Sequence, residues 1–387
     1  MKTKSPFRTS GATLGFMTEN SVPQDQVQPR SIVARLPKYA AGKPPVQIQG
    51  LSSFKLSSNE IPFGPLPQVR QAVLDQDALN RYPDPLSTKL REALADYLDV
   101  PADDIVTGAG SLGALVQILN TFAGQNEDGI QDEVIFAWRS FEAYPILVQT
   151  AGALPVPVPV LADGRHDLEA MIEAINENTS VILLCTPNNP TGPILTQAEV
   201  DDFISRVPRN VLIVLDEAYI EFVRDPQSVD GVKTYKANQN VVLLRTFSKA
   251  HGLANLRVGY SVAHPEITNN LRVIATPFAV SSVAQDAAIA SLKHIDAVYE
   301  RVDSLVAERE RVVAALVEQG WKFPATQANF VWLPLGEKTT QFVERAEARA
   351  LSVRGFAHEG VRISIAEPEA NDRFIKLCAE SLDLAQS

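Results

Sequence analysis

Three kinds of feature are scarce in this sequence of 387 residues, and each scarcity argues against a class of protein. Only two cysteines occur, Cys185 and Cys378, and both lie beside apolar residues, so the sequence predicts reduced, buried thiols and no disulfide framework. No apolar run approaches the roughly 20 residues that span a bilayer. Basic residues are too few to balance the acidic ones, and the net charge of -11 argues against nucleic acid or an anionic membrane as a partner. We therefore expect a cytoplasmic protein that acts on small molecules.

The N-terminal region also lacks the apolar block of a secretory signal peptide. We interpret residues 1–27 as a disordered leader, with Met17 as an alternative start. Ordered structure is expected from about Ser31, and residues 35–39, which include Tyr39, are expected to form a short extended arm.

The chain is longer than one growing core usually supports, which predicts a large domain and a smaller companion. We expect residues 28–58 to form the arm and part of the small domain. The large domain is expected at residues 59–275, where apolar strands and helical segments alternate. Long amphipathic helices and short strands then predict a small α+β domain at residues 276–387.

One stretch combines a buried strand with reactive side chains. Residues 241–244 are apolar, and Thr246, Ser248 and Lys249 follow directly. Such a run suits a strand covered on both faces, and ligands in α/β sheets bind beyond the carboxyl ends of such strands. A lysine there can attack a carbonyl when its amine is neutral. Because the hydroxyls and Arg257 could hold a phosphate, the combination suggests pyridoxal phosphate as cofactor.

Two further apolar runs end in polar residues. Residues 181–185 lead to Asn189, and residues 211–215 lead to Asp216 and Tyr219. Strands that alternate with helices predict an α/β fold with a mostly parallel central sheet, whose strand ends converge on one edge.

A proline-rich segment should lie at the margin of this sheet. Residues 153–160 alternate apolar residues with prolines, and proline has no N–H to donate to a neighbouring strand.

A glycine-rich turn could bind a phosphate without charged side chains. Gly108, Gly110 and Gly113 connect a short strand to a helix, whose free N–H groups would face an anion beside Ser111. The spacing also allows a dinucleotide fingerprint as an alternative. No clear acidic residue closes a second strand about 20 residues later, as that fingerprint requires.

In their order and spacing these motifs resemble the pyridoxal-phosphate-dependent aminotransferases of fold type I, and among them the histidinol-phosphate aminotransferase group. The resemblance covers about residues 30–385. It rests on Asn-Asn-Pro-Thr-Gly at 188–192, Asp-Glu-Ala-Tyr at 216–219, Ser-Lys at 248–249, Arg257, Asn-Arg-Tyr-Pro-Asp at 80–84 and Gly-Val-Arg-Ile-Ser at 360–364. Residues 136–145 look most like the aromatic, phenylalanine-type enzymes of that group.

The resemblance implies how a cofactor would be held. Lys249 would be the Schiff-base lysine and proton shuttle, and Asp216 would pair with the pyridine nitrogen. Asn189 and Tyr219 would bind the ring's 3-oxygen, while Phe141 would stack on the ring. The phosphate would be bound by Gly110, Ser111, Thr246, Ser248, Arg257 and, from a second subunit, Tyr82. Ser111 is followed by Leu112 where the family usually has Asp or Asn, so backbone donors must suffice there.

On the substrate side, Arg362 resembles the family's anion-binding arginine, which can clamp a carboxylate with two parallel hydrogen bonds. Arg354, Tyr39 and Asn59 resemble residues that line the same side. No residue is assigned to a metal.

These expectations describe a homodimeric enzyme that transfers an amino group from an aromatic amino acid to a 2-oxo acid such as 2-oxoglutarate. The nearest alternative is histidinol-phosphate aminotransferase. A decarboxylase or lyase on the same scaffold, and a cofactor-binding regulator or structural dimer without chemistry, are further alternatives.

Overall fold

The computed structural model describes residues 27, 29–37 and 42–385. The chain divides into two compact units, residues 1–36 and 37–387. In the first unit, helix α1 spans Ser31–Arg35, and at its end the Leu36 N–H donates a hydrogen bond to the Ile32 carbonyl. The expected extended arm is therefore wrong at Arg35, because this helical turn includes it. Tyr39 lies outside the described residues, as does the expected leader with Met17, apart from Val27.

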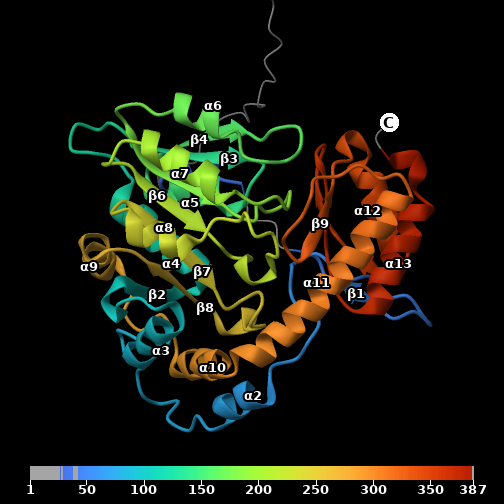
Figure 1. The fold of residues 1–387 in the computed structure, drawn as a ribbon, viewed down its shortest axis with the longest axis horizontal. Coiled ribbons are helices and arrows are strands. Elements are labelled where there is room, and N and C mark those ends of the chain that lie inside the picture. The colour runs from blue at the N-terminus through green and yellow to red at the C-terminus, as the bar shows by residue number, and fades with distance from the viewer. Residues whose placement is uncertain (1–26, 28, 38–41, 386–387) are drawn as a thin grey trace, which may run out of the picture. The chain divides into compact units, whose positions relative to one another are not determined.

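The larger sheet of the second unit has seven strands in the order β2-β8-β7-β6-β5-β3-β4 and lies among helices, in the left-hand part of Figure 1. Its strands are β2 (Ile105–Ala109), β3 (Glu133–Trp138), β4 (Leu154–Pro159), β5 (Thr179–Cys185), β6 (Leu212–Asp216), β7 (Val241–Thr246) and β8 (Val258–Val262). Strand β8 pairs antiparallel with both its neighbours, β2 and β7, and the other pairings in this sheet are parallel. The mostly parallel sheet is as predicted. Strand β8 is absent from the prediction, since a glycine and a serine interrupt its apolar run.

Helices cover both faces of this sheet, and alternate residues of each strand point to opposite faces. Ile213 and Leu215 of β6 belong to one hydrophobic core, and Leu212 and Val214 belong to the other. The first core includes residues of α2 (Pro67–Leu74), α3 (Thr88–Leu98), α6 (Leu168–Glu173), α7 (Gln197–Arg206), α8 (Gly231–Ala237) and α10 (Ser282–Lys293). The second includes residues of α4 (Gly110–Phe122), α5 (Ala143–Ala151) and α9 (Pro265–Ile274). Burial on both faces explains the continuous apolar runs.

The C-terminal part contains a smaller antiparallel sheet in the order β11-β12-β9. Its strands are β9 (Phe330–Leu333), β11 (Arg354–Phe356) and β12 (Gly360–Ser364), and they are accompanied by α11 (Ile295–Glu318), α12 (Thr339–Glu347) and α13 (Pro368–Ala379). Strand β1 (Phe54–Lys55) pairs in parallel with β10 (Leu351–Ser352), so the start of the second unit joins this part. The boundary expected near residue 275 stays a prediction.

Strand β4 is the edge strand that its prolines predicted, and among the described strands it pairs only with β3. The N–H groups of Leu154 and Val160 donate to the carbonyls of Asp132 and Trp138 on the β3 side. The prolines at positions 155, 157 and 159 alternate with those residues, so their nitrogens face the open side.

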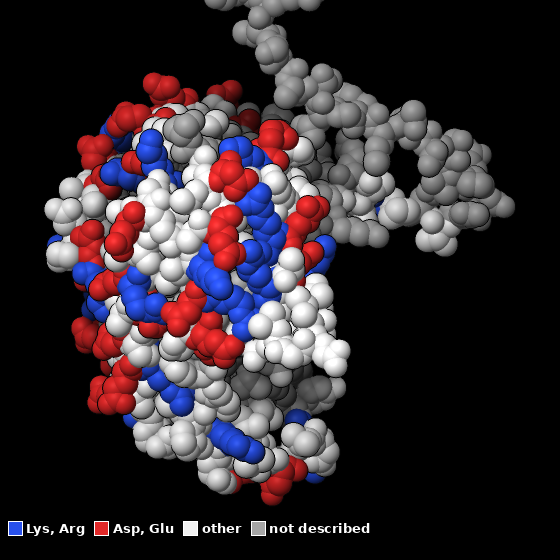
Figure 2. All heavy atoms as spheres, turned by 90° about the vertical axis from the view of Figure 1, so that its right-hand side faces the viewer, with Lys and Arg blue, Asp and Glu red and all other residues white. Residues whose placement is uncertain are grey.

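The surface over α12 and α13 carries both signs of charge side by side (Figure 2). Arg345 pairs with Asp383, and Arg349 pairs with Glu380. Pairs this exposed contribute little to stability, but they leave this face without a field of one sign. In the described part of the chain, no helix is both long and apolar enough to cross a membrane.

The start of α4 lies against β8 because residue 259 is glycine. A Cβ atom added at Gly259 would lie 2.3 Å from the Ser111 nitrogen and 2.5 Å from the Gly110 carbonyl carbon. Both atoms belong to the helix backbone, so they cannot rotate away as a flexible side chain could.

We expect Gly259→Ala to lower the free energy of unfolding by about 1–3 kcal/mol, the range for overpacked sites. Gly64→Ala is the matched control, because no heavy atom of the described residues lies within 4 Å of a Cβ added there. Thermal unfolding of the two variants checks this expectation, and equal midpoints would contradict it.

Candidate active site

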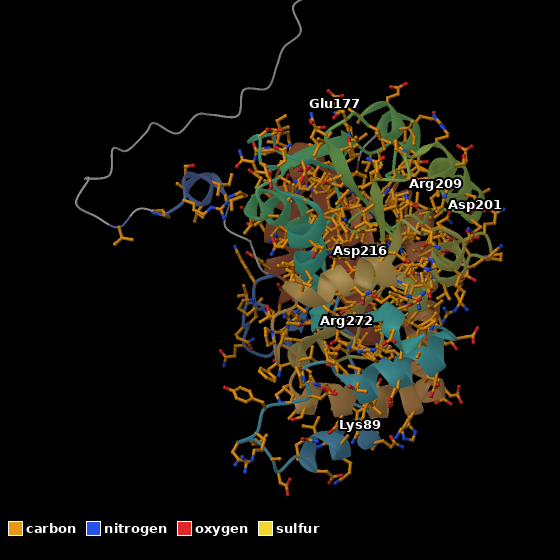
Figure 3. The ribbon with its side chains drawn as sticks, turned by 90° about the vertical axis from the view of Figure 1, so that its left-hand side faces the viewer. Lys89, Glu177, Asp201, Arg209, Asp216 and Arg272 are labelled. Carbon is orange, nitrogen blue, oxygen red and sulfur yellow. The ribbon has the colours of Figure 1, made fainter. Side chains whose placement is uncertain are left out.

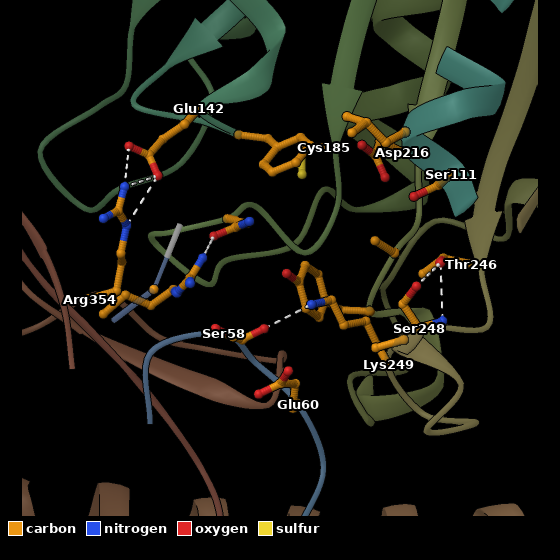
Figure 4. A pocket seen from close by; sticks show the side chains of 18 of the residues that line it. Ser58, Glu60, Ser111, Glu142, Cys185, Asp216, Thr246, Ser248, Lys249 and Arg354 are labelled. Carbon is orange, nitrogen blue, oxygen red and sulfur yellow. Dashed lines mark hydrogen bonds and ion pairs between the residues drawn. The ribbon is translucent and has the colours of Figure 1, made fainter. Parts of the chain in front are cut away.

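A cavity of about 350 Å³ lies at the carboxyl ends of β5, β6 and β7 (Figure 4). The predicted site residues that line it are Ser111, Phe141, Asn189, Asp216, Tyr219, Thr246, Ser248, Lys249, Arg257, Arg354 and Arg362. Residues from strand ends that are far apart in sequence therefore meet in one place. Among the described residues, no group of three or more His, Cys, Asp or Glu side chains could hold a metal ion.

Lys249 follows β7 and reaches into this cavity. Its Nζ donates to the Ser58 carbonyl at 3.1 Å and lies 5.6 Å from the centre of the Tyr219 ring. Burial is the main cause that lowers the pKa of Lys249 to about 7, and the nearby positive charge of Arg362 contributes to the same shift. A large fraction of this amine is thus neutral near pH 7, which is the form that attacks carbonyl carbon.

Asp216 ends β6 and lies in the interior of the molecule, unlike the outlying Lys89 and Glu177 (Figure 3). Its Oδ2 accepts a hydrogen bond from the Tyr144 hydroxyl at 2.7 Å. Its Oδ1 is buried and has no hydrogen-bond partner among the described residues. Burial raises the pKa of Asp216 to about 6. The free oxygen is therefore suited to a cation or a donor from a ligand.

Tyr144 was not predicted as a site residue, although the sequence offered a signal. It lies three residues after Phe141 in the first turn of α5, and the two rings pack edge to face at 5.6 Å. Its hydroxyl is the partner that fixes the orientation of the Asp216 carboxylate.

The start of α4 and the loop after β7 form an anion cradle. Gly110 has φ +75°, and a Cβ there would lie 2.4 Å from Arg257 Nη2. Arg257 Nη1 donates to Ser248 Oγ at 3.4 Å and to the Ala254 carbonyl at 2.9 Å. Thr246 Oγ1 donates to Ser248 Oγ at 3.0 Å. Hydroxyls, a guanidinium and the N-terminus of a helix thus face one space, the combination that binds phosphates.

The opposite wall carries two arginines. Arg362 Nη1 donates to Asn189 Oδ1 at 2.5 Å, and Nη2 donates to the Ser57 carbonyl at 2.8 Å. Arg354 forms an ion pair with Glu142 at 2.7 Å. Glu142 also lines the cavity and was not predicted, because its partner is 212 positions away in the sequence.

Asn59 lies behind Tyr219 and does not line the cavity. Its Nδ2 donates to the Tyr219 hydroxyl oxygen at 3.0 Å, and the Ser364 hydroxyl donates to its Oδ1 at 2.9 Å. The side chain that was expected to touch a substrate thus orients Tyr219.

Tyr82 is not brought to the cavity of its own chain. The residue is 82% exposed, and its ring stacks on that of Phe278 with ring centres 4.6 Å apart. This position leaves open the expected contact with a second subunit.

Comparison with known proteins assigns the chain to a family. The family model described as aminotransferase class I and II matches residues 52–377. The chain belongs to the class I and II aminotransferases. A relative named aromatic amino acid aminotransferase, from Streptomyces avermitilis, is 50% identical to this aminotransferase over 349 residues, or 90% of the chain and 96% of the relative. A protein of the same name from Thermobifida fusca is 50% identical over 347 residues, or 89% and 95% of the two chains.

Solved structures confirm the predicted fold of the aminotransferase. The histidinol-phosphate aminotransferase of Sinorhizobium meliloti, solved in complex with pyridoxal-5'-phosphate, matches with a TM-score of 0.77 at 28% identity, covering 85% of this aminotransferase and 91% of that chain. A putative histidinol-phosphate aminotransferase from Erwinia carotovora atroseptica matches with a TM-score of 0.79 at 25% identity, covering 86% and 96%.

Because Asp216 is buried, its ionisation should lower the stability of the folded aminotransferase when no ligand pairs with it. Its folded pKa of about 6 lies above the ordinary value of 3.8, so the folded state loses stability as the pH rises between these values. In protein freed of small molecules, Asp216→Asn should be more stable than wild type by roughly 3 kcal/mol above pH 7 and by little below pH 4.

Denaturant unfolding at several pH values measures this difference. Asp96→Asn, at an exposed position, is the control and should change little at any pH. A gain for Asp216→Asn that is equal at pH 4 and pH 8 would contradict the assigned cost of ionisation.

Proposed function

We propose that this aminotransferase uses pyridoxal phosphate to transfer an amino group from an aromatic amino acid to a 2-oxo acid such as 2-oxoglutarate. The observation that carries the proposal is the presence of Lys249, Asp216 and Arg362 around one cavity. The names of relatives that are about 50% identical over nine tenths of the chain support the aromatic substrate.

The residues present fit this cofactor. The unpartnered Oδ1 of Asp216 offers a carboxylate to a protonated pyridine nitrogen, and that cation would remove the cost of burying the charge. The absence of a side chain at Gly110 lets the Arg257 guanidinium lie against the start of α4, and together with Ser111, Thr246 and Ser248 this guanidinium suits a phosphate. Phe141 would cover a face of the ring, and Asn189 and Tyr219 would bind its 3-oxygen.

When bound, pyridoxal phosphate supplies an aldehyde for amino groups and a cationic ring that takes up electrons from a broken Cα–H bond. Lys249 would hold the cofactor through its Nζ until the amino group of the substrate takes its place. The freed amine, with its lowered pKa, would then accept the Cα proton and deliver it back. Arg362 would clamp the substrate carboxylate and so fix the Cα–H bond within reach of Lys249. Ser58 would steady the amine through its carbonyl.

We further propose that the enzyme is a cytoplasmic homodimer in which Tyr82 of the partner subunit reaches the phosphate. Tyr82 and Phe278 are both exposed, together with Leu79 and Leu86 nearby in the sequence, and apolar surface of this kind is usual at an interface. The buried free thiols of Cys185 and Cys378 suit a reducing compartment. The division into domains at residues 59–275 and 276–387 remains part of this proposal.

Histidinol phosphate is the second candidate substrate, because solved relatives at 25–28% identity carry that name. Half-reactions of the cofactor-loaded enzyme with phenylalanine and with histidinol phosphate distinguish the two. We expect phenylalanine to change the cofactor's visible absorbance at least about tenfold faster, a ratio that about 1.4 kcal/mol of preference provides. Faster reaction with histidinol phosphate would favour the second candidate.

Lys249→Ala tests the mechanism in the same half-reaction. The rate should fall by at least about 10²-fold, since no amine then moves the Cα proton. An unchanged rate in this variant would remove Lys249 from its assigned role.

Mixed dimers test the position of Tyr82. Lys249→Ala and Tyr82→Ala chains are each expected to give poorly active homodimers at limiting cofactor. If the tyrosine acts across the interface, a dimer of one chain of each kind has one site with both native residues. We therefore expect co-refolded mixtures to regain activity, and a mixture no better than its parents would place Tyr82 in its own chain's site or outside it.

A further inference from the structure

Glu142 forms an ion pair with Arg354, an arginine on the substrate side of the cavity. Its Oε1 and Oε2 accept hydrogen bonds from Arg354 Nη2 at 2.8 and 2.7 Å, and Oε2 also accepts one from Arg354 Nε at 3.2 Å. Both side chains line the cavity, and their exposed fractions are 25% for Glu142 and 14% for Arg354 (Figure 4). The pair is thus half-buried and faces any ligand that enters the cavity.

Arg354 is also the cross-strand neighbour of Arg362. The two residues stand opposite each other on β11 and β12, so their side chains leave the same face of the sheet. Both line the cavity. Two adjacent guanidinium groups match the two ends of a small dicarboxylic acid, but Glu142 already supplies one carboxylate.

A second ion pair close by does not face the cavity. Arg139 Nε donates to Glu359 Oε2 at 2.7 Å. The guanidinium carbons of Arg139 and Arg354 lie 5.3 and 5.2 Å from the centre of the same Phe356 ring. Arg139 and Glu359, both in the described part of the chain, are not among the lining residues. This pair is a built-in control for an effect of charge alone.

We propose that Glu142 determines specificity by competing with the distal carboxylate of dicarboxylic substrates for Arg354. The inference rests on the proposed function in one respect, the assignment of the substrate's α-carboxylate to Arg362. An uncharged aromatic side chain leaves the Glu142–Arg354 pair intact. An acidic side chain must displace Glu142 or lie beside its negative charge, so acids such as 2-oxoglutarate bind more weakly than the two arginines alone would allow.

The alternative role for Glu142 is structural. Like charges opposite each other on paired strands repel, and a carboxylate that neutralises Arg354 lets the two arginines stand together. A purely structural carboxylate would affect stability, and it would affect all ligands of the cavity equally. Competition would affect only ligands with a second carboxylate.

Calorimetric titration of the cofactor-loaded protein with two unreactive acids separates these roles. Glutarate carries two carboxylates, and 3-phenylpropionate carries one carboxylate and an aromatic ring. In Glu142→Gln we expect the Kd of glutarate to fall about tenfold, and that of 3-phenylpropionate to stay within about twofold, because one charged hydrogen-bonded pair is worth about this much. Glu359→Gln should leave both constants unchanged.

The double variant Glu142→Gln/Arg354→Gln should lose the tighter binding of glutarate, since the Arg354 guanidinium for which the carboxylates compete is then absent. Equal changes for both acids, or none for glutarate, would overturn the proposal. Weaker binding of glutarate in Glu142→Gln would also overturn it, because Glu142 would then serve to position Arg354. These titrations measure binding without turnover, so a failure of the proposed transamination would appear separately in the half-reactions.

Discussion

The site depends on the removal of water from the carboxyl ends of β6 and β7. Two hydrophobic cores cover the faces of these strands, and the residues at their ends are buried with them. Burial acts in opposite directions on the two groups that matter most. It lowers the pKa of Lys249 to about 7 and raises that of Asp216 to about 6, so both groups move toward their neutral forms. The fold thus places a basic group, Lys249, and an acidic group, Asp216, where a charged ligand can form an ion pair with either.

The same constraint explains the carboxylates beside the arginines. Glu217, the residue after Asp216, is fully buried and pairs with Arg245 of β7 at 2.8 Å. On the substrate wall, Arg354 pairs with Glu142. Removing one partner of a buried pair leaves a charge that water cannot reach, which is costly. Of the two pairs, Arg354–Glu142 lines the cavity, so a charged substrate that enters meets an arginine that is already paired.

Much of the fold and part of the site could be predicted from local pattern. Lys249 and Asp216 follow apolar runs directly, and parallel strands bring such ends together. Contacts between distant segments carry no local signal. The Tyr144–Asp216 bond joins residues 72 positions apart, and the Ser58 carbonyl is 191 positions from Lys249. Strand β8 was missed because Gly259 interrupts its apolar run. Glycine is needed there because the start of α4 lies against it, and the sequence around β8 does not reveal that contact.

The prolines of β4 decide where other chains can attach to the large sheet. An incoming strand needs N–H donors and carbonyl acceptors on an exposed edge, and unprotected edges template aggregation. On the open side of β4, the alternate positions that would donate are Pro155, Pro157 and Pro159. That edge can accept hydrogen bonds but cannot donate them in register, so it resists extension by a strand from another chain. Strand pairing between copies is therefore disfavoured at this edge, and the large sheet ends at β4.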